Sequence, residues 1–225
     1  MKLFIDTANL VDIEKALDMG FCGVTTNPSL MAKEPKGDYE KHLRKIVAML
    51  RNYEESSGDN PSLSVEIFTN DKEEIIKQAK KFYEFLDYDS LAIKIHISYE
   101  GQGSLSVIRK LYIEGIDVNC TACMSVSQAV LASQAGAKYV SLFWGRIRDG
   151  GGDPAEVVTK SKKIIGDNSE IIVGSIRKVE DIIDALVCGA DIVTVPPKFL
   201  PEMTQHVKTD EVVGQFFKDF ELWLK

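Results

Sequence analysis

Short apolar segments alternate with amphipathic segments along most of the chain. The apolar segments are rich in β-branched residues and predict strands, whereas the segments between them repeat apolar residues at the spacing of one helix face. We expect strands at residues 3–6, 23–27, 63–68, 91–97, 117–121, 139–143, 171–175 and 191–195. The helices expected between these strands span residues 8–19, 39–53, 72–85, 104–114, 125–134, 154–165 and 179–187.

The regular order of strand and helix predicts an α/β fold in which the strands run parallel. Eight such units in 225 residues match the size of a (β/α)8 TIM barrel, and we predict one domain over residues 1–225. Gly115, Gly136 and Gly189 follow predicted helices and precede predicted strands, where a left-handed turn favours glycine. A doubly wound sheet is the alternative fold. It is disfavoured because no Gly-x-Gly-x-x-Gly motif follows the first strand.

The end of the chain, residues 209–225, predicts an additional C-terminal helix. Its apolar residues recur at helical spacing: Val212, Val213, Phe216, Phe217, Phe220, Trp223 and Leu224. This segment is too apolar for a frayed tail, so it needs a surface to pack against. Two packing modes are open from the sequence: the helix folds back over its own barrel, or it docks on a neighbouring subunit.

Composition and net charge limit the classes of molecule that the protein is expected to bind. The net charge is -7 and the isoelectric point is near 5.1, which opposes non-specific binding to nucleic acid or to an anionic membrane. No apolar run approaches the length of a membrane span, and the acidic Asp6 comes too early for a signal peptide. We therefore expect a cytoplasmic protein whose partners are small-molecule anions bound by a few arginines.

Two of the four cysteines, Cys120 and Cys123, form a Cys-x-x-Cys motif. A zinc site would need a second pair of ligands at comparable spacing, and none is present. A thioredoxin-like site would place the first cysteine at the start of a helix, whereas Cys120 lies at the end of a predicted strand. We expect the motif to consist of ordinary buried thiols.

One charged residue, Lys94, interrupts the apolar strand at residues 91–97. Burial of an ammonium group is costly unless it has a partner, and no carboxylate lies in this segment. Burial also disfavours the protonated form and favours a free amine that can attack a carbonyl. A lysine that forms a Schiff base is therefore the first hypothesis. The alternative is a lysine whose stem crosses the strand and whose head reaches water.

Other polar residues are predicted to join Lys94 at the C-terminal ends of the strands, where TIM barrels carry their active sites. They are Asp6, Thr26, Asn27, Glu66, Asn119 and Thr121. Some have purely structural alternatives: Asp6 as a cap of the next helix, and Asn27 as the start of a turn at Pro28. Their convergence on one end of the barrel favours a shared cavity.

Arginines follow the sixth and seventh predicted strands: Arg146 and Arg148 come first, and Arg177 lies beside Ser175. A guanidinium group suits phosphate oxygens, and many barrels bind phosphate near strands seven and eight. Ser175 and Arg177 are therefore the better-placed pair for a phosphate. The alternatives are solvated surface arginines and a serine that caps the following helix.

Five stretches of the chain form a characteristic set. They are Phe4-Ile5-Asp6-Thr7-Ala8-Asn9, Gly23-Val24-Thr25-Thr26-Asn27-Pro28-Ser29, Ile93-Lys94-Ile95, Gln128-Ala129 to Gly136-Ala137 with Tyr139-Val140-Ser141, and Ser175-Ile176-Arg177. This set resembles the small transaldolase family, which also includes fructose-6-phosphate aldolase, and the resemblance covers almost the whole chain. It implies a class I aldolase-type barrel without a metal or other cofactor. In such an enzyme Lys94 forms an imine with a ketose, and a dihydroxyacetone unit moves between aldehydes.

The resemblance also implies roles for individual residues. Glu66 would act through a water as general acid and base, Asp6 would assist proton transfer at the substrate hydroxyls, and Thr121 would help to hold the water. Asn27 and Asn119 would bind the dihydroxyacetone portion with Ser141 beside it, and Arg146, Ser175 and Arg177 would hold the phosphate. Thr26 and Phe143 complete the expected substrate-binding set.

Two positions distinguish the branches of this family. Glu66 stands where the fructose-6-phosphate aldolase branch resembles a glutamine enzyme, and Phe143 stands at that branch's tyrosine site. Phenylalanine cannot donate a proton to release the enamine, so transfer should dominate over cleavage. Two departures leave the preferred sugar open: His96 replaces a usual proline, and Cys123-Met124 replaces a hydrophobic-Phe pair. His96 is either a buried, hydrogen-bonded residue or a pH-sensitive neighbour of the lysine.

The leading hypothesis is a transaldolase of the pentose phosphate pathway. It would move dihydroxyacetone from fructose 6-phosphate or sedoheptulose 7-phosphate to erythrose 4-phosphate or glyceraldehyde 3-phosphate. The alternatives are an aldolase that releases free dihydroxyacetone and a non-catalytic barrel that binds sugar phosphates. The resemblance further suggests a ring-shaped homo-oligomer, a pentamer or a decamer, with the C-terminal helix at the contacts.

Overall fold

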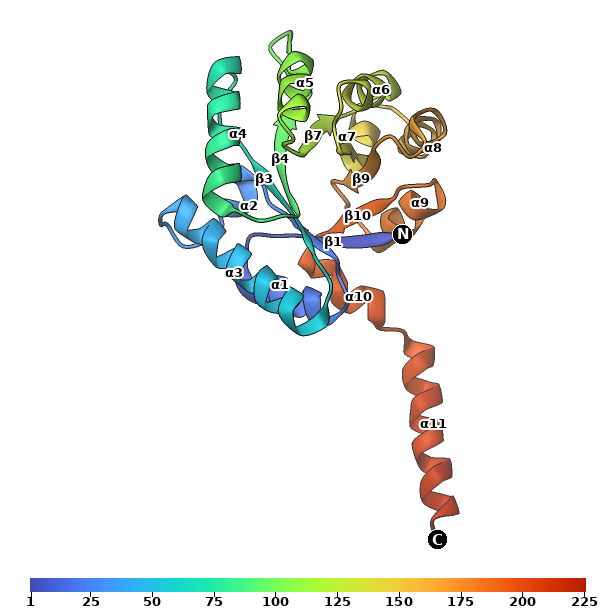
Figure 1. Ribbon diagram of the computed structural model, residues 1–225. Coiled ribbons are helices and arrows are strands. Elements are labelled where there is room, and N and C mark those ends of the chain that lie inside the picture. The colour runs from blue at the N-terminus through green and yellow to red at the C-terminus, as the bar shows by residue number, and fades with distance from the viewer.

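Eight parallel strands form a closed barrel in the computed structural model, which describes residues 1–225 (Figure 1). The strands follow the chain order around the barrel, and the last strand pairs with the first. They are β1 (Lys2–Asp6), β2 (Gly23–Thr25), β3 (Ser62–Glu66), β4 (Leu91–His96), β7 (Val118–Cys123), β8 (Tyr139–Phe143), β9 (Glu170–Gly174) and β10 (Ile192–Val195). The predicted (β/α)8 barrel is confirmed, and the doubly wound sheet is excluded.

Helices surround the barrel and pack their apolar faces against the outer surface of the sheet (Figure 1). They are α1 (Leu10–Asp18), α3 (Tyr39–Ser57), α4 (Lys72–Leu86), α5 (Leu105–Ile113), α6 (Val126–Gln134), α8 (Pro154–Ile165) and α9 (Val179–Val187). The side chain of Asn9 accepts hydrogen bonds from the first turn of α1, and Asp71 and Ser125 do the same for α4 and α6. Asn9 rather than Asp6 therefore caps α1, which leaves the Asp6 carboxylate free for other contacts.

Three of these helices end at the glycines that the sequence pattern placed before strands. Gly115, Gly136 and Gly189 have φ angles of 76°, 99° and 96°, in the left-handed region that favours glycine. A Cβ atom at Gly136 would also lie 2.5 Å from the ring of Tyr112. The predicted left-handed turns at the helix ends are confirmed.

Several short elements lie in segments without a periodic pattern. They are α2 (Pro28–Met31), the hairpin of β5 (Ser98–Tyr99) and β6 (Gln102–Gly103), α7 (Trp144–Asp149), the 3-10 helix η1 (Pro197–Phe199) and α10 (Leu200–Thr204). Each is too short to repeat a hydrophobic period, so none was predicted. Because all of them follow barrel strands, they build the face of the barrel at the C-terminal ends of the strands.

The interior of the barrel is apolar at one end and polar at the other. Phe4, Ala92, Tyr139, Ile172 and Ile192 form a separate buried cluster. Side chains two residues further along a strand point to the same side of the sheet, one layer higher. That next layer contains Asp6, Lys94, Ser141, Gly174 and Thr194. The two-residue period of the strands therefore places a polar layer above an apolar plug.

The last helix, α11 (Val207–Trp223), projects away from the barrel, and the C terminus lies at its far end (Figure 1). Its apolar side chains are exposed, with Phe216 at 64% and Trp223 at 78%. The predicted C-terminal helix is present, and it does not fold back over its own barrel. None of the helices combines the length and the apolar composition that a membrane crossing requires.

Candidate active site

A cavity of about 380 Å³ opens at the C-terminal ends of the barrel strands. Nine of the predicted site residues line it: Asp6, Asn27, Glu66, Lys94, Thr121, Ser141, Phe143, Arg146 and Ser175. The other three, Thr26, Asn119 and Arg177, do not line it. The barrel thus brings together residues from seven of its strands or the connections that follow them.

Lys94 lies near the end of β4 and lines this cavity with only 6% of its surface exposed. Its Nζ atom donates a 2.8 Å hydrogen bond to the main-chain oxygen of Thr26 and lies 3.3 Å from the carboxylate of Glu66. Glu66 is the register partner of Lys94 on the adjacent strand β3. The neighbouring strand therefore supplies the carboxylate that the lysine's own segment lacks, and the amine does not extend into bulk water.

Asp6, at the end of β1, is the second carboxylate of the cavity. Burial raises its pKa, although the charge of Lys94 and a hydrogen bond from Thr25 act in the opposite direction. Thr25 Oγ1 donates to Asp6 Oδ1 at 2.8 Å and lies 2.5 Å from Thr194 Oγ1. Because Thr25 has a single hydroxyl hydrogen, Thr194 is the donor in the second contact. A chain of two hydroxyl groups therefore ends on the Asp6 carboxylate.

Asn119 and Thr26 lie behind the wall of the cavity. Asn119 Nδ2 donates to Ser64 Oγ at 3.1 Å, and Ser141 Oγ donates to Asn119 Oδ1 at 2.7 Å. The fully buried amide of Asn119 therefore contacts the cavity wall through Ser141. The hydroxyl of Thr26 donates to the main-chain oxygen of Ser64, and its own carbonyl holds Lys94. Both residues support side chains that face the cavity.

Asn27 combines a structural and a cavity-facing position. Its Oδ1 accepts a hydrogen bond of 3.0 Å from the main-chain nitrogen of Leu30 and so caps α2, which begins at Pro28. The capping oxygen is used, but the amide nitrogen of Asn27 is left for a ligand in the cavity. Asn27 can therefore start the turn at Pro28 and still contribute its amide nitrogen to ligand binding.

The hydroxyl of Thr121 is buried and has no hydrogen-bond partner within the protein. The backbone beside it is irregular: Ala122 has a φ of 59°, and the pairing of β7 with β8 shifts between Cys120 and Cys123.

The thiols of Cys120 and Cys123 are free, and their sulfur atoms are 3.9 Å apart. The hydrogen bond between them, together with burial, raises the pKa of Cys120. The prediction of buried thiols is confirmed.

The connections after β8 and β9 form one side of the cavity through Arg146 and Ser175. Ser175 has a φ of 58°, and the cap position of α9 is Lys178, so Ser175 does not cap that helix. Its main-chain oxygen accepts a 3.0 Å hydrogen bond from the main-chain nitrogen of Gly145. A Cβ atom at Gly145 would lie 2.6 Å from this oxygen and from Nε of Arg177, so only glycine fits there.

Arg177 is bound to Asp149 at the end of α7. Its Nη1 donates to Oδ1 at 2.8 Å, and its Nη2 donates to the second carboxylate oxygen. Arg146 lies 3.8 Å from the same carboxylate. The hydrogen bond from Arg177 lowers the pKa of Asp149, and the charges of Arg146 and Arg148 add to this effect. The guanidinium group of Arg177 was expected to hold a phosphate, but in the structure it binds the carboxylate of Asp149.

Arg148 binds Asp181, a fully buried carboxylate in the first turn of α9. Arg148 Nη2 donates at 2.6 Å, Trp144 Nε1 at 3.1 Å and the main-chain nitrogen of Arg177 at 3.1 Å. Burial by itself would raise the pKa of Asp181, but these hydrogen bonds outweigh it and the pKa is lowered. Asp181 therefore ties the connection after β8 to the connection after β9.

Four residues of this arrangement were not predicted from the sequence: Thr25, Thr194, Asp149 and Asp181. Thr25 and Thr194 lie on the inward face of their strands, so the two-residue period could have identified them. Asp149 and Asp181 carry no such signal, because acidic residues near helix ends are common on solvated surfaces. Their partners can be identified only from the structure, in which the connections after β8 and β9 lie side by side.

Residues 3–223 match the model of a protein family described as Transaldolase/Fructose-6-phosphate aldolase. The chain belongs to this family. The match spans the barrel from the second residue of β1 onward and all of α11, which confirms the resemblance seen in the motifs. As a member of the transaldolase/fructose-6-phosphate aldolase family, the protein is an aldolase-type enzyme.

Relatives with curated names agree with this membership. The chain is 40% identical over 226 residues to a "Probable transaldolase" of Caldicellulosiruptor saccharolyticus and 39% identical over 225 residues to one of Agathobacter rectalis. Each alignment covers 98% of this chain and 97% of the relative. Among solved structures, a thiamine phosphate pyrophosphorylase from Pyrococcus furiosus aligns with a TM-score of 0.58 at 14% identity, over 87% of this chain and 85% of that one. That likeness supports the barrel fold alone.

Proposed function

We propose that the protein is a transaldolase that transfers a dihydroxyacetone unit from a ketose phosphate to an aldose phosphate through a Schiff base on Lys94. The donors we expect are fructose 6-phosphate and sedoheptulose 7-phosphate, and the acceptors are erythrose 4-phosphate and glyceraldehyde 3-phosphate. The placement of Lys94 carries the proposal, because a buried amine in contact with the Glu66 carboxylate lines a polar cavity. Such an amine can lose its proton to its neighbour and attack a ketone.

Imine formation requires proton transfers close to Lys94. The amine adds to the C2 carbonyl of the ketose, and the resulting carbinolamine loses water to give a protonated imine. Glu66 is within reach of the amine, so it can take the amine proton and return it to the departing hydroxyl group. The hydroxyl of Thr121 has no protein partner and is suited to hold a water between Glu66 and the substrate.

Cleavage of the C3–C4 bond requires a base at the C4 hydroxyl. The cationic imine accepts the electron pair of the breaking bond, so an enamine remains on Lys94 and the departing fragment becomes an aldose. The raised pKa of Asp6 brings its ionisation closer to neutral pH, where a carboxylate can accept the hydroxyl proton and later return it. Thr25 and Thr194 hold this carboxylate in place.

The enamine then reacts with the second aldehyde. Its nucleophilic carbon attacks the acceptor, Asp6 returns a proton to the new alkoxide, and hydrolysis of the imine frees Lys94 and the new ketose. Phe143 lines the cavity and has no proton to donate to the enamine carbon. This favours transfer over release of free dihydroxyacetone, and it is the reason to prefer a transaldolase over a fructose-6-phosphate aldolase.

Arg146 and Ser175 are the groups we expect to hold the substrate phosphate, because both line the cavity. Arg177 follows Ser175 closely in the chain but is bound to Asp149. It can join the phosphate only by leaving that carboxylate. The phosphate site of the proposal is therefore incomplete until Arg177 changes partner.

Borohydride trapping tests the Schiff base directly. Reduction in the presence of fructose 6-phosphate, followed by peptide mapping, should place the label on Lys94. A label on another residue, or no label, would contradict the proposal. A coupled assay with and without erythrose 4-phosphate then separates the two reactions, since rapid release of a three-carbon product without acceptor would support an aldolase instead.

We also propose that the chain forms a ring-shaped homo-oligomer, a pentamer or a decamer, in which α11 docks on a second copy. The exposed apolar side chains of α11 have no surface to pack against on their own barrel (Figure 1). Each copy also presents a groove of about 870 Å³ between α1, α2 and α3, where Val11, Met31 and Phe68 are among the apolar lining residues. Helix and groove are different surfaces of one copy, so their contact is heterologous, and such a contact forms a ring when the rotation between successive copies closes.

A further inference from the structure

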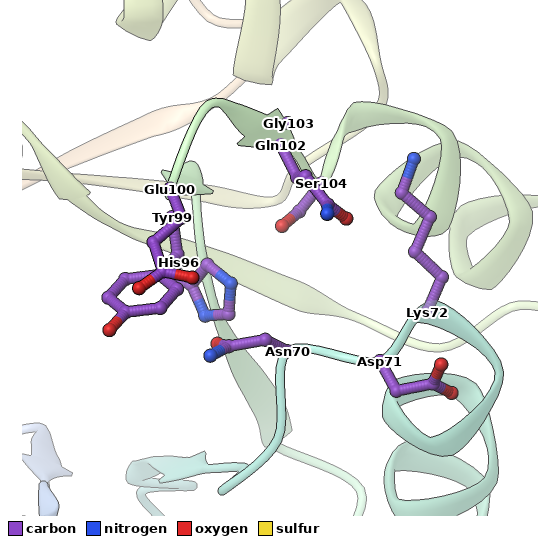
Figure 2. A pocket seen from close by; sticks show the side chains of 9 residues that line it. All are labelled: Asn70, Asp71, Lys72, His96, Tyr99, Glu100, Gln102, Gly103 and Ser104. Carbon is purple, nitrogen blue, oxygen red and sulfur yellow. The ribbon is translucent and has the colours of Figure 1, made fainter.

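A second cavity lies at the same end of the barrel as the catalytic one. It has a volume of about 270 Å³, and its lining includes Asn70, Asp71, Lys72, His96, Gln102 and Ser104 (Figure 2). These residues come from the connection between β3 and α4, from the end of β4 and from the hairpin of β5 and β6. Amide, hydroxyl, imidazole and charged groups predominate, so the cavity suits a polar ligand.

One strand joins the two cavities. β4 carries Lys94 in the catalytic cavity and His96 in the second cavity, about 7 Å further along the strand. His96 is also the register partner of Thr121, which lines the catalytic cavity. A sugar chain that reacts at Lys94 can therefore extend over this strand into the second cavity.

Polar groups of the second cavity are left for a ligand. Ser104 is only 3% exposed, and its hydroxyl does not cap α5, the helix that follows it. Figure 2 shows Gln102 and Ser104 on one side of the cavity, with His96 and Asn70 across from them. Burial lowers the pKa of His96, and the charge of Glu66 opposes this effect. A neutral imidazole offers one donor and one acceptor.

The charges around this cavity do not favour an anion. Lys72 is the only lysine or arginine among the lining residues, and the carboxylates of Asp71 and Glu100 oppose it. Asp71 also accepts a hydrogen bond from the first turn of α4, so that helix end already has an anionic partner. The cavity therefore suits neutral hydroxyl groups better than a phosphate.

We propose that the second cavity is an acceptor subsite that binds the hydroxyl groups of an unphosphorylated sugar chain, with His96, Gln102 and Ser104 as its hydrogen-bonding residues. Its role in acceptor choice rests on the proposed transaldolase function, whereas binding itself does not. A phosphorylated acceptor is anchored by its charged end at Arg146 and Ser175. An unphosphorylated acceptor lacks that anchor and extends into the second cavity, which widens the range of acceptors.

Erythritol tests binding without catalysis, because it has hydroxyl groups but no carbonyl that could react with Lys94. We expect ligand-observed NMR to detect binding to the unmodified enzyme and to Lys94→Met, without competition from inorganic phosphate. Binding should weaken about fivefold in Gln102→Ala and in Ser104→Ala, because each loses a hydrogen bond. The exposed residues Gln205 and Ser56 provide the matched controls Gln205→Ala and Ser56→Ala.

Three results would overturn the subsite: no binding of erythritol, unchanged binding in both cavity variants, or displacement by inorganic phosphate. Gln102 is exposed on the hairpin, so Gln102→Ala keeps the test valid even if Ser104→Ala fails to fold.

Acceptor kinetics test the role of the subsite in the reaction. With fructose 6-phosphate as donor, the double variant Gln102→Ala/Ser104→Ala should lower kcat/KM for D-erythrose about tenfold and leave kcat/KM for erythrose 4-phosphate within about twofold. Equal losses with both acceptors would contradict the proposed role. Absence of transfer to either acceptor by the unmodified enzyme would instead refute the transaldolase function, and the erythritol experiment would still decide whether the subsite exists.

Discussion

Arg177 donates two hydrogen bonds to Asp149, next to the residues proposed to hold the substrate phosphate. Carboxylate and phosphate oxygens fit the same fork of guanidinium donors. A substrate phosphate therefore gains Arg177 only by displacing Asp149. In the proposed phosphate site, the aspartate would therefore be an internal competitor of the phosphate.

We expect Asp149→Asn to lower the KM for erythrose 4-phosphate up to about fivefold, because an exposed ion pair holds Arg177 only weakly and asparagine competes less. The KM for unphosphorylated erythrose should not change. Asp167→Asn, at another exposed ion pair, is the matched control. Steady-state kinetics with both acceptors measure the effect, and a higher KM for the phosphorylated acceptor would show that Asp149 positions Arg177 rather than competing for it.

The variant Lys94→Met should abolish transfer while the barrel stays folded. Methionine keeps most of the apolar stem but cannot form an imine, and it leaves Glu66 without its 3.3 Å partner. Circular dichroism and a coupled transfer assay measure the two properties. Lys138→Met, at an exposed lysine paired with Asp117, should remain active. Normal turnover by Lys94→Met would contradict the mechanism.

Thr194 is expected to act through Thr25 as a positioning residue for Asp6. Its hydroxyl donates to Thr25, which strengthens the hydrogen bond from Thr25 to the ionised carboxylate. Thr194→Val keeps the shape but removes this support, so the already raised pKa of Asp6 should rise further. Because the proposed base is the ionised form, the acidic limb of the kcat profile should move to higher pH by a few tenths of a unit.

Thr204→Val, at a hydroxyl that contacts only carbonyls of α10, is the control for this pH profile. An acidic limb that stays in place in Thr194→Val, with the same loss of rate at every pH, would indicate a purely structural role.

Asp181 should contribute to stability in a pH-dependent way. Its pKa is lowered in the folded protein, so between that value and the ordinary 3.8 the unfolded chain binds a proton more readily. The stabilisation is therefore present above pH 3.8 and is lost as the pH falls through the folded pKa. We expect Asp181→Asn to lower the free energy of unfolding by about 1–3 kcal/mol near neutral pH and to reduce this acid dependence.

Urea denaturation at neutral pH and at acidic pH measures both properties of Asp181→Asn. Asp184→Asn, on the same helix, is the control. An unchanged free energy of unfolding would show that the hydrogen bonds from Arg148 and Trp144 contribute nothing net.

Removal of α11 should dissociate the proposed ring. A chain that ends at residue 205 keeps every barrel strand but lacks the exposed apolar helix. Light scattering coupled to size-exclusion chromatography should then report a smaller assembly than the full chain forms. Phe216→Glu should act in the same direction, whereas Lys218→Glu, on another face of the helix, should not. A full chain that is monomeric would refute the ring.

Much of the fold could be read from local patterns. Each strand carries its own two-residue or continuous apolar signal, and each major helix repeats every three to four residues, so the alternation predicts the barrel without knowledge of contacts. The helix ends at Gly115, Gly136 and Gly189 could also be predicted from the sequence, because a left-handed turn needs only one residue, and glycine favours it. The short elements α2 and α7 were missed because each contains fewer than two helical turns, too few to repeat a hydrophobic period.

Only part of the candidate site could be predicted from the sequence. The sequence determined that Lys94 and Glu66 lie at the ends of adjacent strands, since parallel strands of a barrel end at one face. Only the tertiary structure decided that Thr194 reaches Thr25, that Asn119 lies behind Ser141, and that Asp149 rather than open space faces Arg177. These contacts depend on the register at which the barrel closes and on how the connections after β8 and β9 pack together. Neither property produces a periodic pattern in the sequence.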